Sequence, residues 1–319
     1  GVTNALPGYR EMKSMVFAGI FCKNGDDYPR LRDAMDRLKL SDAALTYEPE
    51  NSAALGFGFR CGFLGLLHLE IVQERLRREF DLDLIVTAPS VAYEIQLTDG
   101  SPSTIIKSPQ ELPDPTKVEV VREPMMKVDI ITPTEHVGSL MQMIQERRGQ
   151  YLNTEYINEQ RAMLHYRLPL SVMLVDFYDK LKSISAGYAS LNYELDGYEP
   201  VEVERLDILV AEEKVEPLAS IVYKDEAYEI GRKIVDKLKE VLPRQMFEVK
   251  IQSAIGGKVV ASARIAAMRK DVTAKLYGGD VTRKRKLLEK QKKGKKKMKM
   301  MGIGKVDIGP EAFMAVLKR

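Results

Sequence analysis

Apolar and polar positions along residues 14–98 follow a pattern that predicts one small α+β unit. Residues 15–21 are almost all apolar, as expected of a strand buried on both faces. Apolar residues three and four positions apart predict one helix after Asp26 and Asp27, which could cap it, and another over residues 62–80. Short strands are predicted at residues 44–47, 57–59, 84–86 and 91–97. The predicted order of elements is therefore β-α-β-β-α-β.

The same order recurs over residues 121–200. Alternating apolar positions predict strands near residues 126–130, 151–157, 162–168 and 189–195, and helical spacing predicts helices over 137–144 and 170–184. Two successive β-α-β-β-α-β units predict two ferredoxin-like sandwiches, each with helices on one face of an antiparallel sheet. Between them, residues 99–120 contain four prolines among Ser, Thr and Asp, which predicts an extended connection.

Residues 201–319 follow a different pattern and predict a separate α+β domain at the C-terminal end. Alternating or apolar stretches predict strands near residues 206–210, 218–223, 247–251 and 259–263, with one long helix over 230–241. A lysine-rich stretch follows, composed mostly of good helix formers apart from Gly294. It has too few apolar residues for a buried face, so we expect it to need a partner or to stay mobile.

Charge is distributed unevenly along the 319 residues, although 49 Lys/Arg against 46 Asp/Glu give a net charge of only +3. Residues 264–299, the basic segment, contain 15 basic and three acidic residues, a local charge of +12 that leaves −9 for the rest of the chain. Such a block is typical of an element that binds a polyanion. The candidate RNA-binding residues within it are Arg264, Arg269, Lys270, Lys275, Arg283, Lys284, Arg285, Lys286, Lys290, Lys292, Lys293, Lys295, Lys296, Lys297 and Lys299.

Three interpretations of the basic segment are open: contact with nucleic acid, contact with an anionic membrane surface, and a solubilising tail. Nucleic acid is favoured because blocks of like charge usually mark interaction elements. No aromatic residue interrupts residues 283–299, so this part is expected to hold phosphates rather than stack on bases. Arg147 and Arg148 are further RNA-binding candidates beside Tyr151, although they also suit a helix end with Gly149 as a left-handed cap.

The sequence shows no constellation for catalysis, a cofactor or a metal. Two cysteines cannot form a disulfide scaffold and suggest a reducing compartment, while three separated histidines exclude a His-x-x-x-His zinc helix. The glycine-rich residues 56–62 lack one glycine of the dinucleotide fingerprint, and no Gly-x-x-x-x-Gly-Lys-Ser/Thr motif occurs, so nucleotide hydrolysis cannot be placed on these residues. No apolar run approaches the roughly 20 residues of a membrane helix.

Several motifs nevertheless resemble one family. Residues 54–76, with Gly-Leu-Leu-His-Leu-Glu at 65–70, resemble the third domain of translational GTPases. Arg147-Arg148-Gly149 and residues 187–190 are similar to fifth-domain motifs of elongation factor G, with Ala186 where Arg is usual. The C-terminal region resembles the domain specific to LepA, also called elongation factor 4, through residues 243–248, 277–280 and 283–292. The resemblance spans almost the whole chain.

The resemblance implies the C-terminal half of a ribosome-bound translational GTPase, with residues 1–13 as the linker from a missing second domain. GTP and Mg²⁺ would belong to the missing GTPase domain, so we expect no cofactor and no GTPase activity in this chain alone. The implied partners are a 70S-type ribosome, rRNA and tRNA, without an obligate oligomer. The implied location is cytoplasmic and ribosome-associated, with a second, peripheral location on the cytoplasmic side of the cell membrane. A polybasic module for anionic membrane surfaces is the alternative function.

Overall fold

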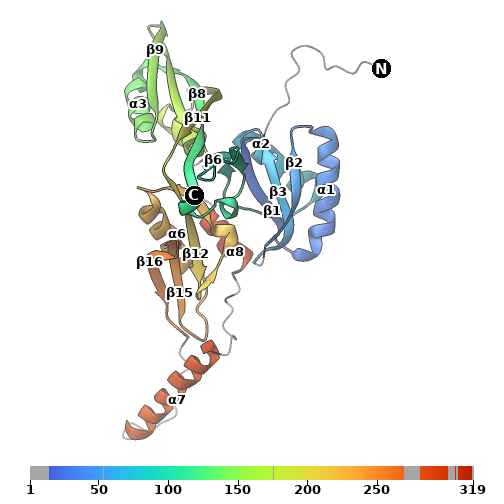
Figure 1. Cartoon of the computed structure of the whole chain (residues 1–319), viewed down its shortest axis with the longest axis vertical. Helices are drawn as coiled ribbons and strands as arrows, with labels where there is room; N and C mark the ends of the chain where they lie inside the picture. The colour runs from blue at the N-terminus through green and yellow to red at the C-terminus, as the bar shows by residue number, and fades with distance from the viewer. Residues whose placement is uncertain are drawn as a thin grey trace. The chain divides into compact units, whose positions relative to one another are not determined.

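The computed structural model describes residues 14–52, 54–174, 176–268, 281–300, 306 and 308–317, and the predicted linker 1–13 lies outside them. The described chain is mixed α+β with several antiparallel sheets, as predicted (Figure 1). It forms two compact units, the first comprising nearly all described residues up to Val203 and the second those from Glu204 onward. Among the described helices, none is long and apolar enough to cross a membrane.

The first sheet has the strand order β2-β3-β1-β4, and β5 pairs with β1. Its strands are β1 (Val16–Cys22), β2 (Thr46–Ser52), β3 (Gly56–Phe63), β4 (Leu84–Val86) and β5 (Ser90–Val91). Helix α1 (Tyr28–Ser41) connects β1 to β2, and α2 (Leu66–Phe80) connects β3 to β4. Most of the predicted apolar stripes are buried, namely Leu31, Met35 and Leu38 on α1 and Leu69, Val72 and Leu76 on α2. Phe80, the last predicted member of the α2 stripe, is only half-buried.

Two local predictions for this sheet are wrong. The side chain of Asp27 does not cap α1, because its carboxylate accepts a hydrogen bond from Arg30 at 2.9 Å. The side chain of Asn24 instead accepts from the Asp26 amide at 3.3 Å, before a short 3-10 turn (Gly25–Asp27). Helix α2 starts at Leu66 rather than at Gly62, because β3 continues to Phe63 and its backbone pairs with β1.

The prediction that residues 91–97 form one strand of the first sheet is also wrong. Only β5 pairs with β1, whereas β6 (Tyr93–Leu97) pairs with β7 (Thr104–Ile106) and β8 (Val118–Pro133) of the next sheet. The proline-rich connection then covers the first sheet on the face opposite the helices. The Lys107 ammonium lies 5.7 Å from the centre of the Phe17 ring, and Arg60 donates a hydrogen bond to Ser108 at 3.2 Å. Strand β1 is therefore buried on both faces.

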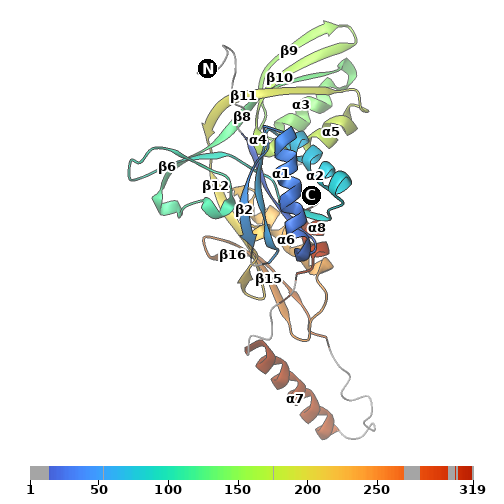
Figure 2. The same cartoon turned by 90° about the vertical axis from the view of Figure 1, so that its right-hand side faces the viewer.

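The second sheet has the order β7-β6-β8-β10-β9, with β11 paired to β8. Its longer strands are β8 (Val118–Pro133), β9 (Gln150–Asn158), β10 (Arg161–Pro169) and β11 (Ser190–Pro200). Helices α3 (Val137–Gln145), α4 (Leu170–Met173) and α5 (Phe177–Ile184) belong to this sheet, and α3 and α5 lie on the same face of it (Figure 2). The helix predicted over 170–184 is interrupted, because Asp176 adopts a left-handed conformation with φ 46°.

The second unit has a sheet in the order β13-β12-β15-β16, with β14 paired to β12. Its strands are β12 (Val203–Val210), β13 (Glu213–Lys214), β14 (Ser220–Tyr223), β15 (Val249–Ile255) and β16 (Lys258–Ile265). Helix α6 (Ala227–Val241) packs on β15 and β16, and α8 (Pro310–Leu317) packs on α6 through the fully buried Phe313. Helix α7 (Val281–Met300) contains most of the basic segment and continues through Gly294.

Candidate nucleic-acid interface

Helix α7 presents a dense array of positive side chains. As far as Gly294, where its described side chains end, it carries seven basic residues and a single acid, Glu289, paired with Arg285 at 3.5 Å. The basic residues are Arg283, Lys284, Arg285, Lys286, Lys290, Lys292 and Lys293. Because a helix turns about 100° per residue, these positions surround its axis rather than forming one stripe. Like charges three and four residues apart repel one another, so an anionic partner would stabilise this helix.

Helix α7, as far as its side chains are described, also lacks a packed apolar face. Its apolar side chains Val281 and Leu288 are exposed, and none of its described side chains is buried. Helices in proteins obtain most of their stability from packing an apolar face, and the described part of α7 has none. The expectation that the basic segment needs a partner stays a prediction, and this geometry agrees with it.

The other basic candidates have varied surroundings. Arg264 lies on β16, mostly exposed, with its guanidinium 3.7 Å from the Glu248 carboxylate. Three candidates lie outside the described residues: Arg269, Lys270 and Lys275. Four more belong to the last turns of α7, whose backbone alone is described: Lys295, Lys296, Lys297 and Lys299. Their contacts stay predictions.

Arg147 and Arg148 follow α3 in the first unit. The Arg147 side chain is only 17% exposed, and its guanidinium donates a hydrogen bond to Asp176 at 2.9 Å. Arg148, rather than Gly149, has the left-handed backbone, with φ 62°. Glycine is needed at 149 for a different reason, since a Cβ there would lie 2.7 Å from the Ile144 carbonyl oxygen. The prediction that Gly149 is the left-handed cap is therefore wrong.

The geometry indicates that Arg147 fixes the break between α4 and α5. Burial alone would raise the pKa of Asp176, but hydrogen bonds and positive charge from Lys180 and Arg147 outweigh it and lower the pKa. The Lys180 ammonium lies 2.9 Å from the same carboxylate. A carboxylate held by two cations is thereby placed at Asp176, whose left-handed backbone lies between α4 and α5.

Replacing Arg147 with glutamine is expected to lower the free energy of unfolding by about 1–2 kcal/mol at pH 7. This is less than the roughly 1.5–3 kcal/mol of a hydrogen bond to a charged group, because the Asp176 side chain is 35% exposed and solvent screens the pair. Because the pKa of Asp176 is lower in the folded state, its ionised form stabilises the fold above the unfolded pKa and loses this effect as pH falls through the folded pKa. The difference between wild type and Arg147→Gln should therefore shrink below about pH 4. Urea unfolding of both proteins at pH 7 and pH 3 measures this difference in stability. If Arg147→Gln left the stability unchanged but abolished RNA binding, the structural role of Arg147 would be contradicted.

His68 and the two cysteines have structural surroundings. His68 bonds Asp42 through Nε2 at 2.7 Å, and its Nδ1 accepts from the Leu64 amide at 3.1 Å. Both cysteines are buried, and burial raises the pKa of the Cys22 thiol to about 11. Across the described residues, no group of three His, Cys, Asp or Glu side chains could hold a metal ion.

Comparisons with known proteins agree with the motifs. Residues 120–209 match the family model described as "Elongation factor G C-terminus", and residues 210–318 match "GTP-binding protein LepA C-terminus". These matches define a class, the translation factors. The chain is 56% identical over 312 residues to elongation factor 4 of Symbiobacterium thermophilum, covering 98% of this chain and 51% of that protein. The chain belongs to the elongation factor 4 (LepA) family, which confirms the resemblance.

Other relatives give the same picture. Elongation factor 4 of Parasynechococcus marenigrum (strain WH8102) is 56% identical over 314 residues, covering 98% of this chain and 51% of that protein. The "Translation factor GUF1 homolog, organellar chromatophore" of Paulinella chromatophora is 55% identical over 314 residues, or 98% and 52% of the two chains. A crystal structure of a Thermus thermophilus protein has a TM-score of 0.39 and 18% identity over 63% of this chain and 43% of that chain, too low to carry an argument. The chain spans about half the length of the curated relatives it matches.

Proposed function

We propose that this chain is the ribosome- and tRNA-binding portion of a LepA-type translation factor acting in the cytoplasm on the elongating ribosome. The observation that carries the proposal is the charge of α7. Its described side chains include seven basic residues and only one acidic residue, and they cover no core. Phosphate backbones are the polyanion that lysine and arginine arrays of this density usually bind. We assign the basic segment to the backbone of tRNA or rRNA and the second sheet to a position against rRNA.

The chain spans about half the length of its relatives, which leaves room in the parent protein for a separate GTP-binding part. We assign GTP and Mg²⁺ to the part of those proteins that this chain does not span, and binding to the part that it does. The activity assigned to the whole protein is a step on the ribosome such as reverse translocation, maintenance of fidelity under stress, or ribosome assembly. The charge on α7 supports RNA contact in each of these roles.

The fold proposed for the binding portion is two ferredoxin-like sandwiches followed by a family-specific domain. Strand orders β2-β3-β1-β4 and β9-β10-β8-β11, each with two helical connections, support this assignment. In both, the first and third strands are central neighbours and the fourth strand lies beside the first.

Pelleting with ribosomes and with anionic vesicles tests the proposed function. At physiological salt the chain is expected to sediment with ribosomes, and added rRNA should release it, because phosphates compete for the same cations. Vesicles containing phosphatidylglycerol should retain little protein once rRNA is present. Vesicles that outcompete rRNA under these conditions would overturn the proposal in favour of the membrane-surface alternative.

A further inference from the structure

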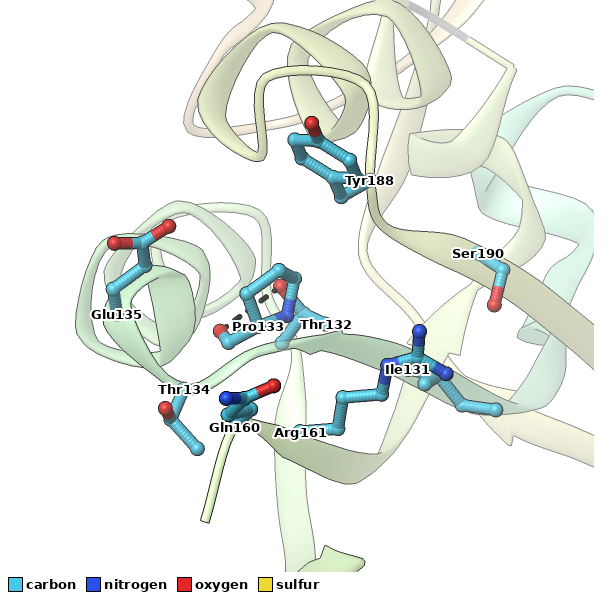
Figure 3. Close-up of a pocket in the computed structure, with 9 residues that line it drawn as sticks. All are labelled: Ile131, Thr132, Pro133, Thr134, Glu135, Gln160, Arg161, Tyr188 and Ser190. Carbon is cyan, nitrogen blue, oxygen red and sulfur yellow. Dashed lines mark hydrogen bonds between the residues drawn. The ribbon is translucent and has the colours of Figure 1, made fainter. Parts of the chain in front are cut away.

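A hollow of about 680 Å³ lies at one end of the second sheet, away from the basic segment in sequence. Figure 3 shows its walls, which come from the end of β8, the turn after it, the start of β10 and the start of β11. Its lining includes Thr134, Glu135, Gln160, Arg161, Tyr188 and Ser190. Ligand sites are commonly about 300–1,000 Å³, so the hollow has room for one nucleotide.

Strand register brings these residues together. Arg161 pairs with Pro133, and Ser190 pairs with Ile131, on opposite sides of β8. Because residues directly opposite each other share a face of an antiparallel sheet, the Arg161 and Ser190 side chains lie on the same face. Tyr188 lies on the loop that precedes β11, and Arg161 lies at the start of β10. The two side chains therefore line different walls of the hollow (Figure 3).

The loop that carries Tyr188 is held by hydrogen bonds at both ends. The Lys182 ammonium donates to the carbonyl oxygens of Gly187, at 3.2 Å, and Ala189, at 2.6 Å. The fully buried Ser185 hydroxyl donates to the Leu181 carbonyl at 2.8 Å and accepts from the Ala189 amide at 3.0 Å. Positive φ angles of 49° and 87° at residues 186 and 187 complete the turn.

This rigid loop presents a side chain that packs on little. Tyr188 is 75% exposed, while its amide donates to the Ser185 carbonyl at 2.9 Å. A preorganised aromatic side chain loses little conformational entropy when it binds a flat partner, which is how proteins use such residues in recognition. Burial in the core therefore does not explain why this ordered loop holds a tyrosine at its surface. Stacking of the Tyr188 ring on an unpaired base would explain it.

Charge in the hollow agrees with a phosphate beside that base. Within the part of the chain that the structure describes, the exposed Arg161 guanidinium has no carboxylate partner. The one acid in the lining, Glu135, lies on the far side from the Arg161 guanidinium (Figure 3), with its carboxylate 3.4 Å from His136. Amide and hydroxyl groups of Gln160, Thr134 and Ser190 could bond a base edge or a 2′-hydroxyl.

We propose that this hollow binds one unstacked nucleotide of single-stranded RNA, with its base on Tyr188 and its phosphate on Arg161. The proposal rests on the proposed function, because it takes the chain to be an RNA-binding portion. It adds a folded, base-contacting site to the phosphate contacts of α7, which has no aromatic residue. Single-stranded RNA is commonly recognised through bases that stack on aromatic side chains, whereas a duplex keeps its bases stacked and out of reach.

A single-stranded oligoribonucleotide containing 4-thiouridine tests the site on the full chain. Irradiation is expected to crosslink it to the peptide containing Tyr188. Tyr188→Ala should weaken binding, followed by fluorescence anisotropy, roughly five- to 100-fold, the range for loss of one base–aromatic stack. Tyr188→Phe should bind as wild type, because the ring is retained. Arg161→Gln should make the slope of log K against log salt shallower by about 0.7.

Tyr156 is the matched control, since it is 69% exposed but does not line the hollow. Tyr156→Ala should leave both the crosslink and the affinity unchanged. Wild-type affinity in Tyr188→Ala, a crosslink at Tyr156 instead, or equal affinity for duplex RNA would overturn the proposal. If the chain still sediments with ribosomes in that case, only the hollow assignment fails, whereas loss of ribosome sedimentation in the wild type would remove the proposed function itself.

Discussion

Replacing Lys290, Lys292 and Lys293 of α7 with glutamine is expected to weaken ribosome binding roughly a hundredfold at physiological salt. Each phosphate contact contributes about 0.7–0.9 to the slope of log K against log salt, so three lost contacts make the slope shallower by about 2.1–2.7. The three side chains are exposed and cover no core, so the fold should be unchanged. Sedimentation with ribosomes over a range of salt concentrations measures both quantities.

A matched triple variant exists on α6. Replacing Lys233, Lys237 and Lys239 with glutamine removes the same charge from another helix of the same unit. Lys233 and Lys237 there pair with Glu229 and Glu240, as expected of a solvated face with mixed charge. We expect this variant to bind with wild-type affinity and slope. An equal loss in both triples would show that net charge alone sets the affinity, and would contradict a specific role for α7.

Replacing Phe177 with alanine is expected to destabilise the second sheet by about 3–5 kcal/mol, the usual cost of removing a buried phenylalanine side chain. Phe177 is 1% exposed in the first turn of α5, the helix that leads into the Tyr188 loop. Because the chain has two units, a single unfolding transition cannot be assumed. Hydrogen exchange of the β8 and β10 amides reports the stability of this sheet directly.

The neighbouring residue provides the control. Tyr178 is 49% exposed, and its ring lies 5.5 Å from the Lys182 ammonium. Tyr178→Ala should cost only about 0.5–1 kcal/mol, the worth of an exposed cation–π contact. Similar protection losses in the two variants would mean that Phe177 does not anchor α5.

Much of the fold could be predicted because burial leaves a periodic pattern in the sequence. The alternation of Ala162, Leu164, Tyr166 and Leu168 predicts a strand with one buried face, and all four side chains are buried in β10. The helical stripes of α1 and α2 are confirmed for the same reason. Such positions face a core regardless of which distant segment completes it.

Features that depend on distant partners could not be predicted in the same way. The alternating apolar residues of β6, Tyr93, Ile95 and Leu97, would also suit a strand of the first sheet. Strand β6 pairs instead with β7 and with β8, which begins only after the proline-rich connection. The break between α4 and α5 depends on Arg147, 29 residues before Asp176, while periodicity continues through the break. Local pattern carries no information about either contact.

The same distinction applies to the two candidate RNA-binding sites. The basic segment could be predicted from composition alone, because its 15 basic residues within 264–299 lie close together in the sequence. The hollow beside Tyr188 is not, since Arg161 and Ser190 meet only through their register with β8. Its one signal in the sequence is that Tyr188 belongs to residues 187–190, a motif similar to one in elongation factor G.

Crosslinking from the lysines of residues 284–299 on intact ribosomes tests the central claim most directly. If the basic segment holds phosphates of tRNA or rRNA, RNA crosslinks from these lysines should dominate, and they should disappear as salt rises because the contact releases counterions. Crosslinks to tRNA near the peptidyl-transferase region would agree with the proposed role on elongating ribosomes. Ribosome-bound chain that forms no RNA crosslink from any of these lysines would contradict the account.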